Sequence, residues 1–349
     1  MIQARHDQAV APYAATASIP GPEPRTGADL IRATQPFQVE SPLRSWLLLL
    51  TTLAALAVTL FAVVHIPWWP LKVFSGVICG LIQMRLFIFY HDLMHGAIFR
   101  QSRAAQVLMD VIGFYLVAPK RVWKESHDFH HQNNAKLMGS TIGSYPLMFR
   151  DKLDTIAPRR RIAYRLARHP LTIALGYFTV FGIGMVVGPV LRNPRRYWAG
   201  MASALFHYLL FALATWAFGW PTGVCAVLVP TFVAMGLGSY LFYAQHNFPT
   251  MRLTQRADWD FTSAALGASS MFDMSRMMHW FTGNIGYHHV HHLNHRIPFY
   301  RLPEAMRAIP ELQHPSRTSW RVRDIIAGFR LFVWDHAQER MISRAESIL

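Results

Sequence analysis

Histidine is the residue type in this chain whose number and spacing indicate chemistry. Of 349 residues, 18 are histidine, against 19 aspartate and glutamate together. Eight of them gather in three short clusters: His91 and His95; His127, His130 and His131; His288, His291 and His292. Residues three and four apart share one face of a helix, so each cluster, if helical, directs its imidazoles at one point. Neutral imidazole binds first-row transition metals.

The number of clustered histidines predicts more than one metal ion. His246 ends a long apolar run and is a ninth candidate ligand. Zinc sites usually have about four ligands, and zinc metalloproteases place Glu after the first His of a His-x-x-x-His motif. Here Asp92 stands at that position. A nitrogen-rich, acid-poor set favours two redox-active iron ions that react with dioxygen, with a membrane zinc protease as an alternative.

Three polar residues beside the clusters are candidates for catalytic support. Asp92 and Asp128 each follow a predicted ligand and can accept an imidazole N–H that fixes the orientation of the ring. Each is equally well interpreted as a helix-surface acid near Lys or Arg. Asn284, four residues before His288, either holds a metal-bound water or caps a turn, and we favour the cap.

The other nine histidines are not predicted to bind metal. His289 faces away from its neighbours on a helix, and His295 lies beyond the third cluster. His279 is a candidate to contact the metal ligands without binding the metal itself. His207 lies inside an apolar run, where we expect a packed, hydrogen-bonded ring. Ordinary surface or interfacial positions are expected for His6, His65, His169, His314 and His336.

The elements that carry these residues are predicted to be membrane-spanning helices. The chain is 52% hydrophobic and only 15% charged, whereas soluble domains average about a quarter charged residues. This composition excludes a disordered chain or a disulfide scaffold and disfavours a soluble enzyme. A span requires about 20 mostly apolar residues. Four runs meet this requirement and form two hairpins, at about 46–64, 74–90, 197–220 and 222–245.

Three further segments are amphipathic or interrupted. Residues 171–191 are apolar but rich in glycine and flanked by basic segments, which predicts a re-entrant or interfacial segment. Residues 104–118 are too short for a span and contain Asp110, so they should be interfacial or buried in protein. Residues 319–343 mix apolar and basic positions and predict an amphipathic helix, on the membrane surface or packed over the metal-binding part.

Cys79 and Cys225 both lie in apolar runs, so we expect each of them to be a small buried residue.

The distribution of positive charge predicts the topology. The long segments after the second and fourth predicted spans are rich in Lys and Arg, while the turns at 65–71 and 219–221 contain none. By the positive-inside rule, the histidine clusters and both termini face the cytoplasm. The net charge of +15 is then a matter of topology, not of nucleic-acid binding. Residues 1–40 predict a disordered tail without a signal peptide, and residues 41–349 a single domain.

In this order and topology, the three clusters resemble the histidine boxes of the membrane fatty acid desaturase family. Four stretches are similar to bacterial acyl-lipid desaturases: WFTGNIGYHHVHHL at 280–293, WDF at 259–261, RIP at 296–298 and GSTIGSYP at 139–146. The resemblance extends from about Ser41 to the C-terminus. The first box departs from the family pattern at Met94 and Gly96, where small residues or Cys and Ser are usual.

The resemblance implies an all-α integral protein of the bacterial inner membrane, with four transmembrane helices and a cytoplasmic helical cap. Its eight box histidines would hold a non-haem di-iron centre, and His246 maps onto an additional family ligand. Such enzymes use O2 and two electrons to introduce a cis double bond into an acyl chain, here a lipid-linked one. Because the chain shows no haem domain and no flavin or nicotinamide motif, electrons would come from an external donor such as ferredoxin, attracted by the basic face.

Two other functions remain as alternatives. The same iron set supports hydroxylation, or carotenoid ketolation and hydroxylation, and the sequence around the third box favours acyl desaturation over these. A non-enzymatic metal transporter would require polar residues along its spans, whereas the predicted first span has no charged residue.

Overall fold

The computed structural model describes residues 24–136, 144–254 and 257–347. Four long apolar helices dominate it, each long enough to cross a membrane, which confirms the four predicted spans. They are α2 (Pro42–His65), α3 (Trp69–Met94), α10 (Pro194–Phe218) and a continuous fourth helix made of α11 (Trp220–Gly223), η3 (Val224–Leu228) and α12 (Val229–Gln245). The fold is therefore that of an all-α integral membrane protein.

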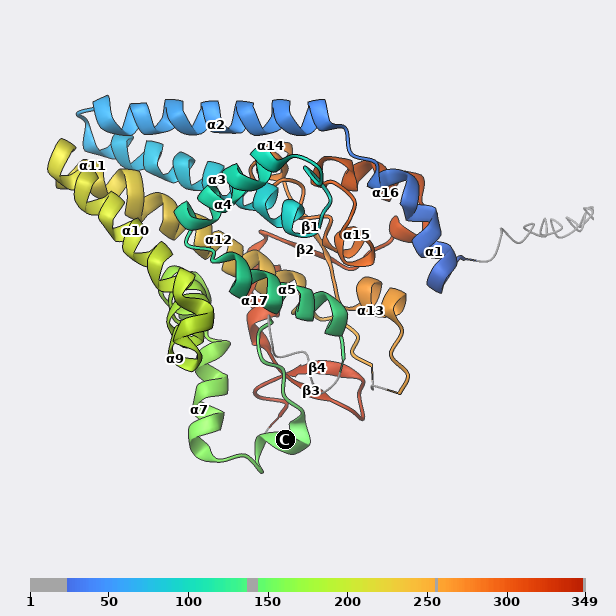
Figure 1. Cartoon of the computed structure of the whole chain (residues 1–349). Coiled ribbons are helices and arrows are strands. Elements are labelled where there is room, and N and C mark those ends of the chain that lie inside the picture. Colours follow the sequence, from blue (N-terminus) through green and yellow to red (C-terminus); the bar gives the residue numbers. More distant parts are fainter. Residues whose placement is uncertain (1–23, 137–143, 255–256, 348–349) are drawn as a thin grey trace, which may run out of the picture.

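The four spans form two hairpins whose short turns lie at the same end of the bundle (Figure 1). Helix α3 packs against both α2 and α12 and is largely buried, whereas α2 and α10 expose most of their apolar residues, as helices that face lipid do. The opposite end of the bundle carries the remaining elements that surround the histidines, which we call the cap: α5 and α13 to α16 (Figure 1).

Shorter elements connect the spans and build the cap. Before the first span lie α1 (Gly27–Thr34) and η1 (Gln35–Gln38). Between the second and third spans lie α4 (Arg103–Tyr115), α5 (Lys120–Asn133), α6 (Arg150–Leu153), α7 (Pro158–Ala167), α8 (Pro170–Ala174), η2 (Tyr177–Val187) and α9 (Gly188–Arg192). After the fourth span lie α13 (Phe261–Gly267), β1 (Met271–Asp273), α14 (Arg276–Phe281), α15 (His288–Leu293), η4 (Phe299–Arg301), α16 (Leu302–Ala308), η5 (Pro310–Leu312), β2 (Arg317–Ser319), α17 (Val322–Arg330), β3 (Leu331–Asp335) and β4 (Arg340–Ser343).

The two interrupted apolar segments are helical, and a re-entrant or interfacial placement of the segment at 171–191 stays a prediction. The segment predicted at 171–191 is a bent helical run of α8, the π-helix η2 and α9, and it is not among the helices long enough to span. The segment predicted at 104–118 forms α4, which packs against α3 and α10 and buries one side. Cys79 and Cys225 are both buried and free, as predicted.

The predicted tail of residues 1–40 is wrong at its C-terminal end. Residues 1–23 lie outside the described residues, but α1 is an ordered helix that buries Leu30 and Thr34. Asn294 donates to Thr34 Oγ1 at 2.6 Å, and Arg25 pairs with Glu311 at 2.8 Å. A helix of eight residues that buries only two side chains has too few apolar residues for composition to reveal it, and only the contact with the cap shows why it is ordered.

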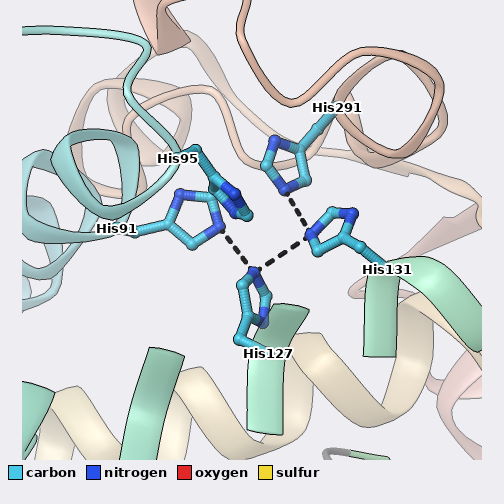
Figure 2. Close-up of side chains that lie close together, drawn as sticks. All are labelled: His91, His95, His127, His131 and His291. Atoms are coloured by element: carbon cyan, nitrogen blue, oxygen red, sulfur yellow. Dashed lines mark hydrogen bonds between the residues drawn. The ribbon is translucent and has the colours of Figure 1, made fainter. Parts of the chain in front are cut away.

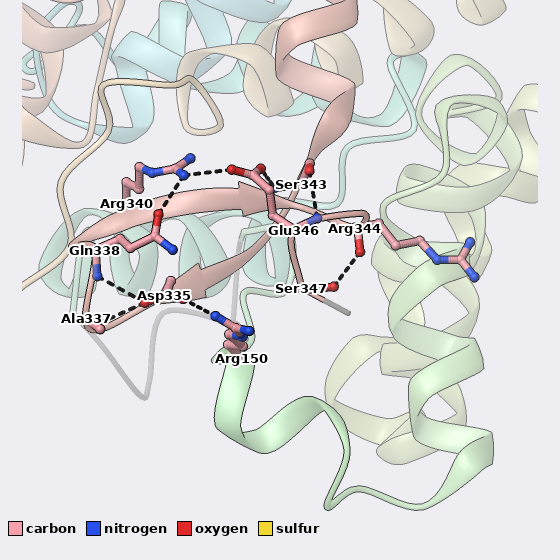
Figure 3. A network of polar contacts seen from close by, with 9 residues as sticks. All are labelled: Arg150, Asp335, Ala337, Gln338, Arg340, Ser343, Arg344, Glu346 and Ser347. Carbon is pink, nitrogen blue, oxygen red and sulfur yellow. Dashed lines mark hydrogen bonds and ion pairs between the residues drawn. The ribbon is translucent and has the colours of Figure 1, made fainter. Parts of the chain in front are cut away.

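The predicted C-terminal helix at 319–343 is also wrong in its second half. Helix α17 ends at Arg330, and β3 then pairs with β4 in an antiparallel hairpin that buries Val333 and Trp334. Asp335 closes the turn, because its carboxylate accepts from the backbone N–H groups of Ala337 and Gln338 at 2.9 and 3.0 Å (Figure 3). Arg150 binds the other oxygen of Asp335 at 3.0 Å and ties the hairpin to α6.

The crossing of α3 and α12 gives a first prediction. A Cβ on Gly80 would lie 2.6 Å from the carbonyl oxygen of Pro230 and 2.7 Å from Cβ of Val233. Gly80→Ala is therefore expected to push the helices apart and to lower stability by about 1–3 kcal/mol, as overpacking does. Thermal unfolding in detergent measures this. Gly184→Ala is the matched control, since its nearest atom would be 3.7 Å away; equal melting temperatures would contradict the close crossing.

Candidate metal centre

All nine histidines predicted as ligands lie where the spans meet the cap. His91 lies in the last turn of α3 and His95 directly follows that helix. Helix α5 carries the second cluster and α15 the third, so both clusters are helical, as their spacing requires. His246 follows the last residue of α12. Four elements therefore bring nine imidazoles to one end of the bundle.

Five of these histidines form a group that we call site one: His91, His95, His127, His131 and His291. One ring nitrogen of each lies within 4.8 Å of the corresponding nitrogen of every other member. The Nε2 atom of His127 lies 3.1 Å from that of His91 and 3.1 Å from that of His131, which in turn lies 3.1 Å from His291 Nε2. Figure 2 shows the five rings turned inward around a common point.

The other four histidines form site two: His130, His246, His288 and His292. The Nε2 atom of His246 lies 2.8 Å from that of His288 and 3.0 Å from that of His130. His292 Nε2 approaches His130 Nε2 to 3.3 Å. Both groups consist of histidines alone, so any ion held there would have nitrogen ligands.

Hydrogen bonds on the outer side of two of the rings determine which ring nitrogen carries the proton in the neutral form. His91 Nδ1 donates to a carboxylate oxygen of Asp92 at 3.0 Å, and His246 Nδ1 donates to the carbonyl oxygen of Ala268 at 2.8 Å. Both partners only accept, so Nε2 of each ring points inward without a proton. Neutral imidazoles with convergent lone pairs fit a divalent transition metal.

Burial keeps these imidazoles uncharged. Desolvation, reinforced by neighbouring imidazoles, holds the pKa of His127, His131, His288 and His291 well below the usual value for histidine. Desolvation also lowers the pKa of His246 to about 4. The neutral form that binds metal is therefore the resting form at neutral pH.

Asp92 is placed to orient a ligand, which is one of the two roles that the sequence allows. It is only 2% exposed, and besides the His91 N–H it accepts the backbone N–H of Phe299 at 2.7 Å. Asn284 donates from Nδ2 to the carbonyl oxygen of Phe299 at 3.1 Å and has a positive φ of 56°. These contacts support a turn-forming role for Asn284, the alternative that we favoured.

Asp128 lies on the surface. Its carboxylate pairs with Lys124 at 2.7 Å, one helical turn away on α5, and both side chains are substantially exposed. Within the described residues, no hydrogen bond joins Asp128 to an imidazole of either site. The arrangement corresponds to the surface-acid alternative.

The remaining histidines mostly lie where the sequence places them. His289 Nε2 donates to the carbonyl oxygen of Leu312 at 3.1 Å and faces away from both sites. His207 is buried and hydrogen-bonds to the Tyr177 hydroxyl at 3.0 Å. His279 packs beside Tyr287 and belongs to neither site. His6 lies outside the described residues.

Two supporting residues were not predicted from the sequence. The His295 ring centre lies 4.6 Å from that of His95, so it packs against site one instead of lying apart from it. Arg85 in α3 donates to Thr52 Oγ1 at 3.0 Å, hydrogen-bonds to the carbonyl oxygen of Trp280 and stacks over that indole. It thereby ties the segment before the third cluster to the spans. An arginine inside an otherwise apolar run was the available signal for Arg85.

Fold and site together define a membrane protein with two groups of histidines that suit metal binding at one end of a four-helix bundle. The family described as "Fatty acid desaturase" matches residues 67–323, most of the chain. The chain belongs to the membrane fatty acid desaturase family, as its histidine boxes indicated.

Curated relatives agree with this assignment. A "Fatty acid desaturase" of Bacillus subtilis (strain 168) is 29% identical over 272 residues, which cover 76% of each chain. An "sn-1 oleoyl-lipid 12-desaturase" of Synechocystis is 25% identical over 299 residues, 82% of each chain. A "Delta(12)-oleate desaturase" of Trichosanthes kirilowii is 25% identical over 311 residues, 77% of this chain and 78% of the relative.

Proposed function

We propose that this protein is an O2-dependent, non-haem di-iron desaturase that introduces a cis double bond into a lipid-linked acyl chain. The observation that supports it most directly is the pair of all-histidine groups at the ends of the spans. In the overall reaction a CH2–CH2 unit loses two hydrogens, and O2 with two electrons and two protons becomes two waters. Bound iron would supply the oxidising power for this reaction.

The residues of the chain have separate roles in the proposal. Site one and site two would each hold one iron through their histidines, His246 included. Asp92 fixes the tautomer and the orientation of His91. The apolar interior between the spans would receive the acyl chain and exclude water from the reacting carbons.

Substrate, partner and location follow from different observations. The Synechocystis relative is named for an oleoyl-lipid substrate, which supports a lipid-linked acyl chain here. The net charge of +15 supports an acidic external electron donor of the ferredoxin type. We place the chain in a bacterial inner membrane with the cap and both termini in the cytoplasm. We assign one desaturase domain to residues 41–349, with α1 packed against its cap.

Expression in a host that lacks the activity tests the function. Gas chromatography with mass spectrometry of total fatty acids should reveal a new monounsaturated acid, two mass units below its precursor. His127→Ala, which removes a nitrogen that contacts two neighbours in site one, is the inactive control. Iron-loaded protein with an electron donor but without a new double bond would contradict the proposal, and a product sixteen mass units above its precursor would favour hydroxylation instead.

A further inference from the structure

Arg168, which follows α7, is a buried cation that has no carboxylate partner in the part of the chain that the structure describes. It is only 5% exposed. Its guanidinium donates to the carbonyl oxygens of Pro146 and Leu331 at 3.1 and 3.2 Å and to Asn247 Oδ1 at 2.5 Å, all uncharged acceptors. Its Nε has no hydrogen-bond partner among the described residues. A buried charge is costly unless an opposite charge compensates it, so a bound anion would lower the cost of this guanidinium.

Arg168 lines the same small cavity as two histidines of site two. The cavity has a volume of about 20 Å³, and its walls include Arg168, Tyr145, Asn247, His130 and His246. A cavity needs roughly 10–15 Å³ to hold a water, so this one accepts a group of about that size and not an acyl chain. Asn247 follows His246 directly and connects Arg168 to the segment that carries this ligand.

The charges around the cavity favour an anion. All four members of site two are histidines, which are neutral when they bind metal. Neutral ligands would not offset the charge of a divalent ion bound at site two. Arg168 adds a further positive charge beside the same cavity. A nearby negative charge stabilises buried positive charges strongly, because the effective dielectric constant inside a protein is low.

We infer that Arg168 and site two together form a binding site for a small anion, of the size of hydroxide, a halide or cyanide. The anion would lie in the cavity that Arg168, His130 and His246 line. The inference rests on the proposed function, because it requires metal at site two.

A pair of diatomic probes tests this inference. Cyanide is an anion and nitric oxide is neutral, they are similar in size, and both bind non-haem iron with optical changes. In Arg168→Gln the dissociation constant for cyanide should rise about tenfold or more. Arg168→Lys keeps the charge and should stay closer to the unmodified protein. Arg160→Gln is the matched control, because it removes the same charge from an exposed position on α7. It should leave the affinity for cyanide unchanged.

The affinity for nitric oxide distinguishes an electrostatic role of Arg168 from a purely structural one. If Arg168 acts through its charge, nitric oxide should bind Arg168→Gln and the unmodified protein alike. Equal weakening of both probes, or equal losses in Arg168→Lys and Arg168→Gln, would show a purely structural role and overturn the anion site. Unchanged cyanide affinity in Arg168→Gln with full iron content would overturn it as well. Protein that binds no iron would instead overturn the di-iron proposal, on which the anion site depends.

Discussion

His288→Ala is expected to lower bound iron from about two ions to about one per chain and to abolish the new double bond. His288 is one of the four histidines that the described residues contribute to site two, and its Nε2 lies 2.8 Å from that of His246. Loss of one of the four nitrogen ligands weakens the binding of iron at site two, whereas the five histidines of site one are untouched. Elemental analysis of the purified protein and fatty acid analysis of the expressing cells measure the two effects.

His289→Ala is the matched control next to it. This ring donates to the carbonyl oxygen of Leu312 and contributes nothing to either site. Its loss removes one hydrogen bond and leaves a cavity in the cap, which lowers stability, but it removes no metal-facing nitrogen and should leave iron content and product per folded protein nearly unchanged. Equal loss of iron in the two variants would refute the division of the third cluster into inward and outward faces.

Asp92→Asn is expected to weaken iron binding at site one by about 10–100-fold, as loss of a ligand-orienting group typically does. The two carboxylate oxygens accept from two different donors, His91 Nδ1–H at 3.0 Å and the Phe299 N–H at 2.7 Å. An amide has only one accepting oxygen, so its NH2 group would face one of these donors. Iron release against a competing chelator measures the change.

Asp128→Asn provides the comparison for the second carboxylate. Asp128 also follows a ligand histidine, but it pairs with Lys124 at the surface. Exposed ion pairs contribute about 0–1 kcal/mol, so this variant should retain iron like the unmodified protein. Similar iron loss in both variants would mean that charge near the sites matters more than the hydrogen bond to His91.

The spacing of the histidines predicted convergence but not the division into two groups. Within α5, His127 and His131 belong to site one while His130 belongs to site two. Within α15, His291 belongs to site one, and its neighbours His288 and His292 to site two. A spacing of three or four residues places side chains on one helix face. Which rings of α5 and α15 meet in the same site depends on how the two helices are placed relative to each other, which is a tertiary property.

The same distinction between local and tertiary features decides which elements could be predicted. A span is recognisable locally, because about 20 apolar residues in a row are rare outside membrane-spanning helices. The hairpin of β3 and β4 was missed because its apolar residues also fit a helical face, and its pairing depends on contacts with α6 and the Tyr164 side chain. The π-helix η2 was anticipated only as an irregular, glycine-rich segment.

The division of ligands between distant segments has a consequence for biosynthesis. Site one needs both His91 and His291, and site two needs both His130 and His292, so neither is complete until the ribosome has made all but the last part of the chain. By then the four spans have already been synthesised. The metal ions that we propose for these sites would therefore be bound by their full sets of ligands only after the four spans have been made.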